Sequence, residues 1–166
     1  MIPPSRTRIL GVLVPLLVAA CGGAGSSSAT TSSQAPSSTA PPVVKTAVAT
    51  LDGKPQSIVV DAAKGMTLYY FLPDKGAGKV ACTGGCLAVW PPMELADGSA
   101  PPAGTGLKGT LGTITNPNGK RQLTYNGWPL YWYAKDKAPG DTTGNNVGQK
   151  WFVATPDMAP NSGGSY

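Results

Sequence analysis

Residues 65–75 (GMTLYYFLPDK) and residues 127–137 (GWPLYWYAKDK) carry the same pattern. In each copy a Gly stands three positions before a Leu-Tyr pair, a second aromatic residue stands two positions after that Tyr, and Asp and Lys close the phrase. So specific a phrase, written twice in a chain of 166 residues, predicts a duplicated structural unit.

The match extends on both sides of the aromatic phrase. Residues 52–54 (DGK) and 118–120 (NGK) each precede a strand-like run, and Asp-Gly and Asn-Gly favour tight hairpin turns. Trp90 and Trp151 follow the two phrases at nearly the same distance. Each unit is therefore predicted as a Gly turn, a strand, a second Gly turn, an aromatic strand, a long loop and a closing Trp. The units cover about residues 51–95 and 115–157.

Large apolar side chains occupy both faces of each aromatic strand. Because side chains alternate along a strand, Leu68 and Tyr70 lie opposite Tyr69 and Phe71. The second copy repeats this arrangement, with Leu130 and Trp132 opposite Tyr131 and Tyr133. Both strands should thus be buried on both sides and central. We predict an all-β domain of about eight short, mostly antiparallel strands, in two pseudo-symmetric halves that form a sandwich or a small barrel.

The N-terminal region is typical of an exported lipoprotein. Arg6 and Arg8 precede about a dozen apolar residues, too few to span a membrane, which needs roughly 20. Residues 18–21 (VAAC) then resemble a bacterial lipobox, which would make Cys21 the lipid-carrying residue of an extracytoplasmic protein anchored to the cell membrane.

The predicted organisation is a signal peptide over residues 1–20 and a lipidated Cys with a disordered Ser/Thr/Pro/Gly linker over 21–44. The duplicated β domain would then span 45–158, and a flexible tail 159–166.

The composition argues against several classes of function. The chain contains no His, which excludes a Ser-His-Asp triad, a His-ligated zinc and a haem with a proximal His. Glu94 is the only Glu, and the Asp residues stand mostly in turn-like contexts, so we expect neither an enzyme nor a bound cofactor or metal. The net charge of +5 falls to about +3 without Arg6 and Arg8, and the remaining Lys are scattered, which argues against nucleic acid. We expect a monomer.

With these features the chain resembles a family of bacterial lipoproteins with a Tyr-x-(Phe/Trp/Tyr)-x-x-Asp motif, also described as a secreted repeat of unknown function. The residues that carry the resemblance are Tyr69, Phe71 and Asp74 in the first copy and Tyr131, Tyr133 and Asp136 in the second. The segment CTGGCLAVWPPM is similar to the family's Cys-x-x-x-Cys followed by Trp-Pro-Pro. Met158 departs from the Gly that is typical after Pro-Asp. The resemblance implies no activity.

Cys82 and Cys86 are expected to form a disulfide, because two nearby Cys outside the cytoplasm most often do. A second hypothesis is that the pair cycles between dithiol and disulfide. A third is that it holds a soft metal such as Cu(I), with Met66 and Met93 near in the sequence.

Three functions are consistent with these residues. The leading hypothesis is a non-enzymatic binding module whose partner, a cell-wall polymer or another envelope protein, contacts loops such as 116–118 or 137–148. The second is redox or copper handling by the Cys pair. The third is a carbohydrate-binding surface, which depends on the exposure of Trp128, Trp132 and Tyr133. Paired catalysis by Asp74 and Asp136 comes last, because both residues have a turn-capping explanation.

Overall fold

The computed structural model describes residues 41–76, 78–96, 98 and 104–162. The predicted signal peptide, the lipidation site at Cys21 and most of the predicted linker lie outside these residues. Within the described part of the chain, no helix is long and apolar enough to cross a membrane.

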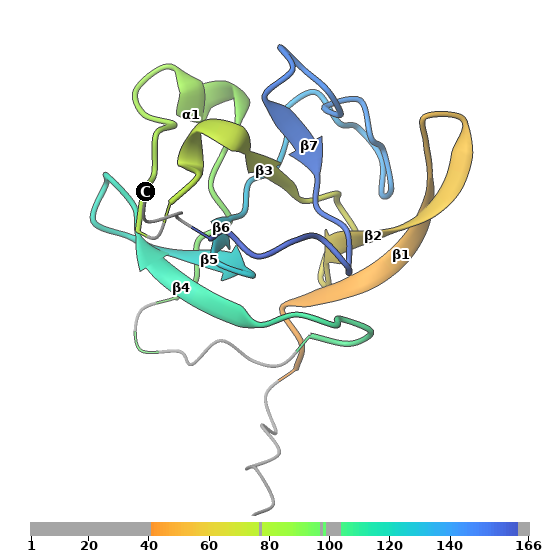
Figure 1. Ribbon diagram of the computed structural model, residues 1–166, viewed down its shortest axis with the longest axis horizontal. Helices are drawn as coiled ribbons and strands as arrows, with labels where there is room; N and C mark the ends of the chain where they lie inside the picture. Colours follow the sequence, from red (N-terminus) through yellow and green to blue (C-terminus); the bar gives the residue numbers. More distant parts are fainter. Residues whose placement is uncertain (1–40, 77, 97, 99–103, 163–166) are drawn as a thin grey trace, which may run out of the picture. The chain divides into compact units, whose positions relative to one another are not determined.

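Seven strands form three small antiparallel sheets in the described residues (Figure 1). β1 (Val44–Leu51) pairs with β2 (Lys54–Asp61), and β3 (Tyr69–Phe71) pairs with β7 (Trp151–Val153). The third sheet contains β4 (Leu111–Thr115), β5 (Arg121–Tyr125) and β6 (Trp128–Pro129). The helical elements among these residues are the 3-10 turn η1 (Leu72–Asp74) and the short α1 (Cys86–Val89). The all-β prediction is confirmed, and the described strands do not close into a barrel.

Each half of the domain begins with a β-hairpin, β1–β2 in the first half and β4–β5 in the second. The first hairpin turns through Asp52 and Gly53, whose φ angles of 52° and 75° suit the left-handed turn that Asp-Gly favours. The predicted starts of the units, at about 51 and 115, are therefore too late by one strand. β1 and β4 escape prediction because their burial is mostly partial, so they lack the strong apolar pattern of the later strands.

The two halves interlock through the segments that follow the two Trp residues. The backbone of Ala154 accepts a hydrogen bond from Val59 N (2.8 Å) and donates one to Leu68 O (2.8 Å), so it lies between two strands of the first half. Met93 makes the equivalent pair of bonds with Leu123 and Leu130 in the second half. The predicted duplication is confirmed, and each copy completes the sheet of the other.

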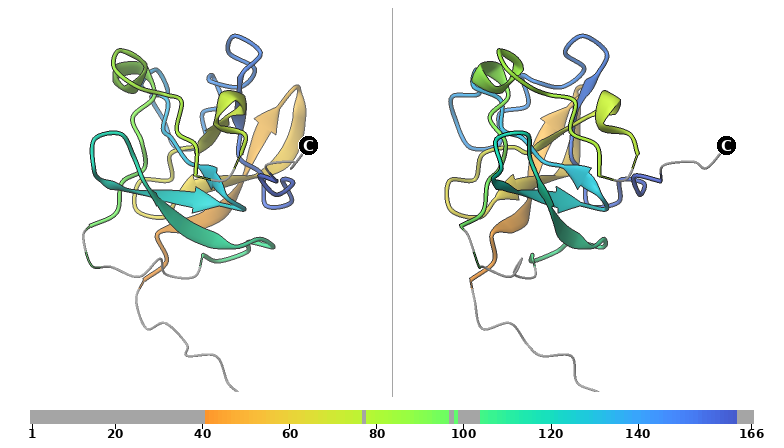
Figure 2. Two further views of the ribbon diagram at one scale, coloured as in Figure 1. Left: turned by 60° about the vertical axis from the view of Figure 1, so that its left-hand side comes forward. Right: turned by 90° about the vertical axis from the view of Figure 1, so that its left-hand side faces the viewer.

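The core consists of two clusters. One is rich in aromatic residues and contains Tyr69, Tyr131, Tyr133, Trp90 and Trp151. The other is mostly aliphatic and includes Leu68, Leu123, Leu130 and Met93. Leu68 directly precedes Tyr69, the first residue of β3, and the two side chains lie in different clusters, so the aromatic phrase separates the two clusters. The long loops that precede the two Trp, one carrying α1 and one leading to β7, rise from the same end of the domain (Figures 1 and 2).

The ends of the domain differ from the predicted boundaries. Val44 is fully buried and starts β1, and Ala62 N donates to Val43 O, so the domain begins before residue 45. The predicted flexible tail also contains folded residues. Ala159 O accepts a hydrogen bond from the indole of Trp128, and Asn161 is buried and donates to Asp74 O and Gly127 O. Residues 159–161 thus belong to the fold, because they form hydrogen bonds with Asp74 of the first motif and with the start of the second phrase.

Candidate functional site

The motif residues of the two copies meet at the centre of the domain. The backbones of Tyr69 and Tyr131 exchange two hydrogen bonds, of 2.8 and 3.0 Å. The phenol of Tyr69 donates to Asp136 Oδ2 (2.7 Å), and the phenol of Tyr131 donates to Asp74 Oδ2 (2.7 Å). The Tyr of each copy therefore binds the Asp of the other copy.

The second oxygen of each carboxylate holds the following loop. Asp74 Oδ1 accepts a hydrogen bond from Ala81 N (2.6 Å), and Asp136 Oδ1 accepts one from Thr143 N (3.2 Å) and another from the hydroxyl of Thr143 (2.5 Å). In both copies the bonded backbone N–H lies seven residues after the Asp. The expected turn-capping role is therefore present, together with a phenol partner that sequence reasoning missed.

Burial sets the electrostatics of this Tyr–Asp network. Desolvation, the adjacent carboxylate and the hydrogen bond to it raise the pKa of Tyr69 and Tyr131 far above the ordinary value of a phenol. Desolvation also raises the pKa of Asp74, although the hydrogen bonds from Ala81 and Tyr131 oppose that shift. Asp74 is 0% exposed and Asp136 is 7% exposed, and each binds a different phenol.

The remaining motif aromatics and the two Trp form a stack of four rings. Phe71 stacks on Trp151 (centroids 4.1 Å apart), Trp151 on Trp90 (3.8 Å), and Trp90 on Tyr133 (4.2 Å). Tyr69 packs edge-on against Trp90, and Tyr131 edge-on against Trp151. Phe71 and Tyr133 thus each stack on the Trp of the other copy, which repeats the exchange made by Tyr and Asp, whereas Tyr69 and Tyr131 contact the Trp of their own copy.

Cys82 and Cys86 form the predicted disulfide, with their Cα atoms 5.5 Å apart. Cys82 is 1% exposed and both residues pack in the aromatic cluster, so the bridge fixes the loop next to Trp90. Met93, predicted as a possible metal ligand beside them, packs in the other cluster. Among the described residues, no group of three or more His, Cys, Asp or Glu is placed to hold a metal ion.

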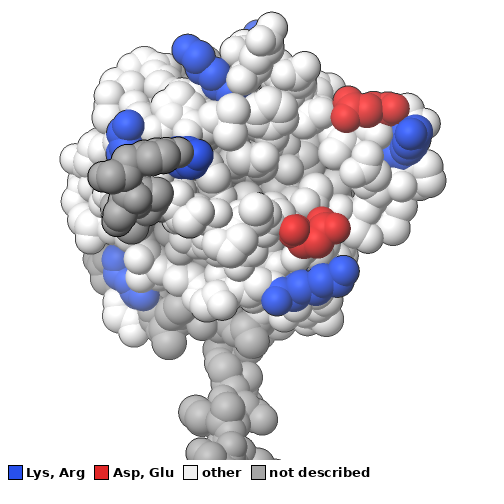
Figure 3. All heavy atoms as spheres, in the orientation of Figure 1, with Lys and Arg blue, Asp and Glu red and all other residues white. Residues whose placement is uncertain are grey.

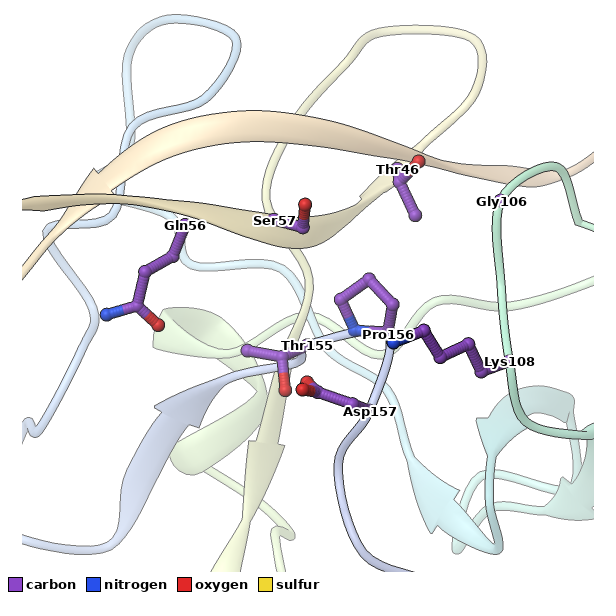
Figure 4. Close-up of a pocket in the computed structure, with 8 residues that line it drawn as sticks. All are labelled: Thr46, Gln56, Ser57, Gly106, Lys108, Thr155, Pro156 and Asp157. Carbon is purple, nitrogen blue, oxygen red and sulfur yellow. The ribbon is translucent and has the colours of Figure 1, made fainter.

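Two adjoining hollows open on the surface. The first, of about 410 Å³, lies between the β1–β2 hairpin and the segment after β7. Figure 4 shows the side chains of Thr46 and Gln56 extending from the hairpin, Thr155, Pro156 and Asp157 facing the hairpin, and Lys108 reaching toward Pro156 from the loop that contains Gly106. The second hollow, of about 350 Å³, is bounded by two half-exposed rings and by polar residues of two turns: Tyr70, Phe152, Asp52, Asn145 and Asn146. Thr155 lines both hollows, so they lie side by side, and we call the two together the groove.

The aromatic residues proposed for carbohydrate binding lie elsewhere. Trp128 and Tyr133 are buried, at 7% and 8% exposure. Trp132 is half-exposed, but its indole N–H donates to Asp61 Oδ2 (3.2 Å) and the ammonium of Lys64 lies over its ring. Tyr70 and Phe152 were missed because their pairing depends on the β3–β7 register, which no local pattern predicts.

The two loops predicted to contact a partner have different surroundings. Asn116 is buried, and its side-chain oxygen accepts hydrogen bonds from Asn118 N and Lys120 N, so it builds the β4–β5 turn. Residues 137–148 instead contribute Asn145 and Asn146 to the second hollow. On the face shown in Figure 3, charged side chains are dispersed, with wide uncharged areas between them.

A family model described as a secreted repeat of unknown function matches residues 46–94 and 112–155. The two matched ranges each run from an initial hairpin strand to the segment that completes the sheet of the other half. No curated protein and no solved structure matches the chain significantly.

Proposed function

This chain belongs to the family of secreted repeats of unknown function, and we propose that it acts as a lipid-anchored, non-enzymatic binding module on the extracytoplasmic face of the cell membrane. Its partner would be a component of the cell envelope, either a wall polymer or another protein. The lipid-anchored state is supported by the VAAC sequence, which places small residues directly before Cys21.

The observation that carries the binding role is the contrast between the core and the surface. Tyr69 and Tyr131 donate their phenol hydrogens to the two motif Asp inside the domain, so these groups are already hydrogen-bonded. The adjoining hollows expose aromatic rings, hydroxyls and amides instead. Concave sites that combine apolar surface with a few polar groups are typical ligand sites.

The non-enzymatic role is supported by the state of the two motif carboxylates. Asp74 and Asp136 are each held by a phenol and by backbone N–H groups, and both are buried. A general acid or base has to reach its substrate directly or through one water. Asp157 and Asp52, which do line the hollows, are exposed and lie in different hollows.

Lipid anchoring is tested by expressing the full chain and its Cys21→Ala variant in a bacterial host supplied with labelled palmitate. We expect the unchanged chain to carry label and to partition into detergent, and the variant to do neither. A Cys82→Ser/Cys86→Ser variant is the matched control, since it should keep the label. If the unchanged chain and the Cys21→Ala variant partition equally into detergent, the chain is not anchored by a lipid on Cys21.

Binding is tested by sedimenting the purified full mature chain with isolated insoluble envelope material. We expect saturable retention, with the retained partner recovered at unchanged mass. Treating the envelope with protease beforehand separates the partners, because retention by a polymer survives and retention by a protein is lost. No saturable retention would overturn the binding role, and a partner of altered mass would overturn the non-enzymatic role.

A further inference from the structure

We propose that the groove formed by the two adjoining hollows binds a neutral glycan chain, with Tyr70 and Phe152 contacting the apolar face of a sugar ring. This inference rests on the proposed binding function and names the class of ligand. It differs from the carbohydrate hypothesis based on Trp128, Trp132 and Tyr133, because two of those rings are buried.

The apolar part of the groove is a pair of neighbouring rings. Tyr70 and Phe152 are direct partners in the β3–β7 register, so their side chains project from the same face. Their centroids lie 5.9 Å apart with the ring planes 32° from parallel, and both side chains are half-exposed. The buried ring of Trp128 packs against Tyr70, with centroids 5.0 Å apart and the ring planes 53° from parallel. A supported, half-exposed ring pair offers a rigid surface for the C–H groups of a pyranose.

The polar part of the groove consists of groups that the fold does not use. The phenol of Tyr70 and the hydroxyls of Thr46 and Thr155 form no hydrogen bond with another described residue, and the side chain of Asn146 forms none either. Gln56 makes one long contact, of 3.4 Å, to Leu51 O. Hydroxyls and amides of this kind can both donate and accept, which matches the hydroxyls of a sugar.

The internal symmetry of the domain supports a role for Tyr70 outside folding. Trp132 stands at the equivalent position in the second half, where Asp61 accepts its N–H and Lys64 covers its face. Tyr70 has neither kind of partner, and Phe152 leaves part of its ring open to solvent. The fold therefore satisfies one of the two equivalent aromatics and leaves the other available.

Charge favours a neutral chain over an anionic wall polymer. The first hollow contains one cation, Lys108, and one anion, Asp157, while the second contains Asp52. A phosphate- or uronate-rich polymer would require an excess of Lys and Arg along the groove. With volumes of about 410 and 350 Å³, each hollow lies within the roughly 300–1,000 Å³ range of small-ligand sites.

The test uses the full mature chain in detergent micelles, with chitohexaose, cellohexaose, maltohexaose and xylohexaose as probes, measured by saturation-transfer NMR and titration calorimetry. We expect one of these neutral glycans to bind. Phe152→Ala should raise its Kd by about tenfold or more, and Tyr70→Phe, which removes only the unpartnered hydroxyl, by roughly two- to fivefold. Trp132→Phe is the matched control and should leave the Kd unchanged.

Each outcome decides a different claim. If no neutral glycan binds at roughly 10 mM while envelope material still retains the chain, the ligand class is wrong and the binding module stands. If a glycan binds to Phe152→Ala and to Tyr70→Phe as tightly as to the unchanged chain, the groove is not its binding site. Retention that protease treatment of the envelope abolishes would also overturn the glycan inference. Loss of all envelope retention would count against the proposed function itself.

Discussion

Tyr70 and Trp132 occupy equivalent positions, one residue after the Tyr of each motif, yet their surroundings differ. Trp132 donates to Asp61 and lies beneath Lys64, whereas Tyr70 faces an open hollow beside Phe152. One residue earlier, Tyr69 and Tyr131 make matching bonds of 2.7 Å. The Tyr–Asp bonds are thus the same in both halves, whereas the next position differs between the halves, and it is the position to which we assign a role in binding.

Removing either central Trp should produce the largest loss of stability, and the two losses should be alike. Trp90 and Trp151 stack on each other at 3.8 Å and each touches one ring of the other copy. We expect Trp90→Ala and Trp151→Ala each to lower the free energy of unfolding by about 3–5 kcal/mol in urea titrations. Trp132→Ala, outside the stack, should cost less. A twofold difference between the stability losses of Trp90→Ala and Trp151→Ala would show that the two Trp are not equivalent.

Alkaline pH should test both phenols together. The pKa of Tyr69 and Tyr131 is raised in the folded state, so their contribution to stability is complete below the unfolded value of about 10 and is lost as the pH rises above it. The expected slope is about 2.7 kcal/mol per pH unit for the two groups, with a further share from Tyr70, whose pKa burial also raises.

Urea titrations from pH 9 to 11, together with tyrosinate absorbance, measure this slope. Tyr69→Phe and Tyr131→Phe should each reduce it by about half. Tyrosinate that appears well before unfolding would contradict the raised pKa values.

Double-mutant cycles should reveal which Tyr forms a hydrogen bond with which Asp. Tyr69→Phe alone should cost roughly 1.5–3 kcal/mol, since it removes a buried hydrogen bond to a carboxylate. The cycle of Tyr69→Phe with Asp136→Asn should show a coupling energy of about 1–2 kcal/mol, and the cycle with Asp74→Asn should show much less. The mirror-image cycles on Tyr131 provide the control. Stronger coupling within one motif than between motifs would refute the exchange.

A further expected effect concerns a difference between the halves. Only the first loop carries a disulfide, whereas in the second the carboxylate of Asp141 accepts hydrogen bonds from Lys137 N and Ala138 N, which lower its pKa. Replacing Cys82 and Cys86 by Ser should lower stability by about 2 kcal/mol, the value expected for so small a ring. Reduction of the unchanged protein should give the same loss in calorimetry. Larger losses would mean that the bridge also holds the aromatic stack.

The duplicated all-β organisation follows from the sequence because its signals are local. The repeated Tyr-x-aromatic-x-x-Asp phrase, the Gly turns and the two Trp can each be read within a short window. The crossing of partners between copies cannot, since Tyr69 and Asp136 are 67 residues apart and nothing near either residue indicates the other. The groove cannot be predicted from the sequence for the same reason, because it depends on the β3–β7 register that places Tyr70 beside Phe152.

The interlocked halves also determine when the chain can fold. Val59 and Leu68, in the first half, find their backbone partner only when Ala154 is present near the end of the domain. Contacts between residues so far apart form slowly and late. The local β1–β2 hairpin needs no later residue, but the sheet of the first half is completed only after almost the whole domain has been synthesised.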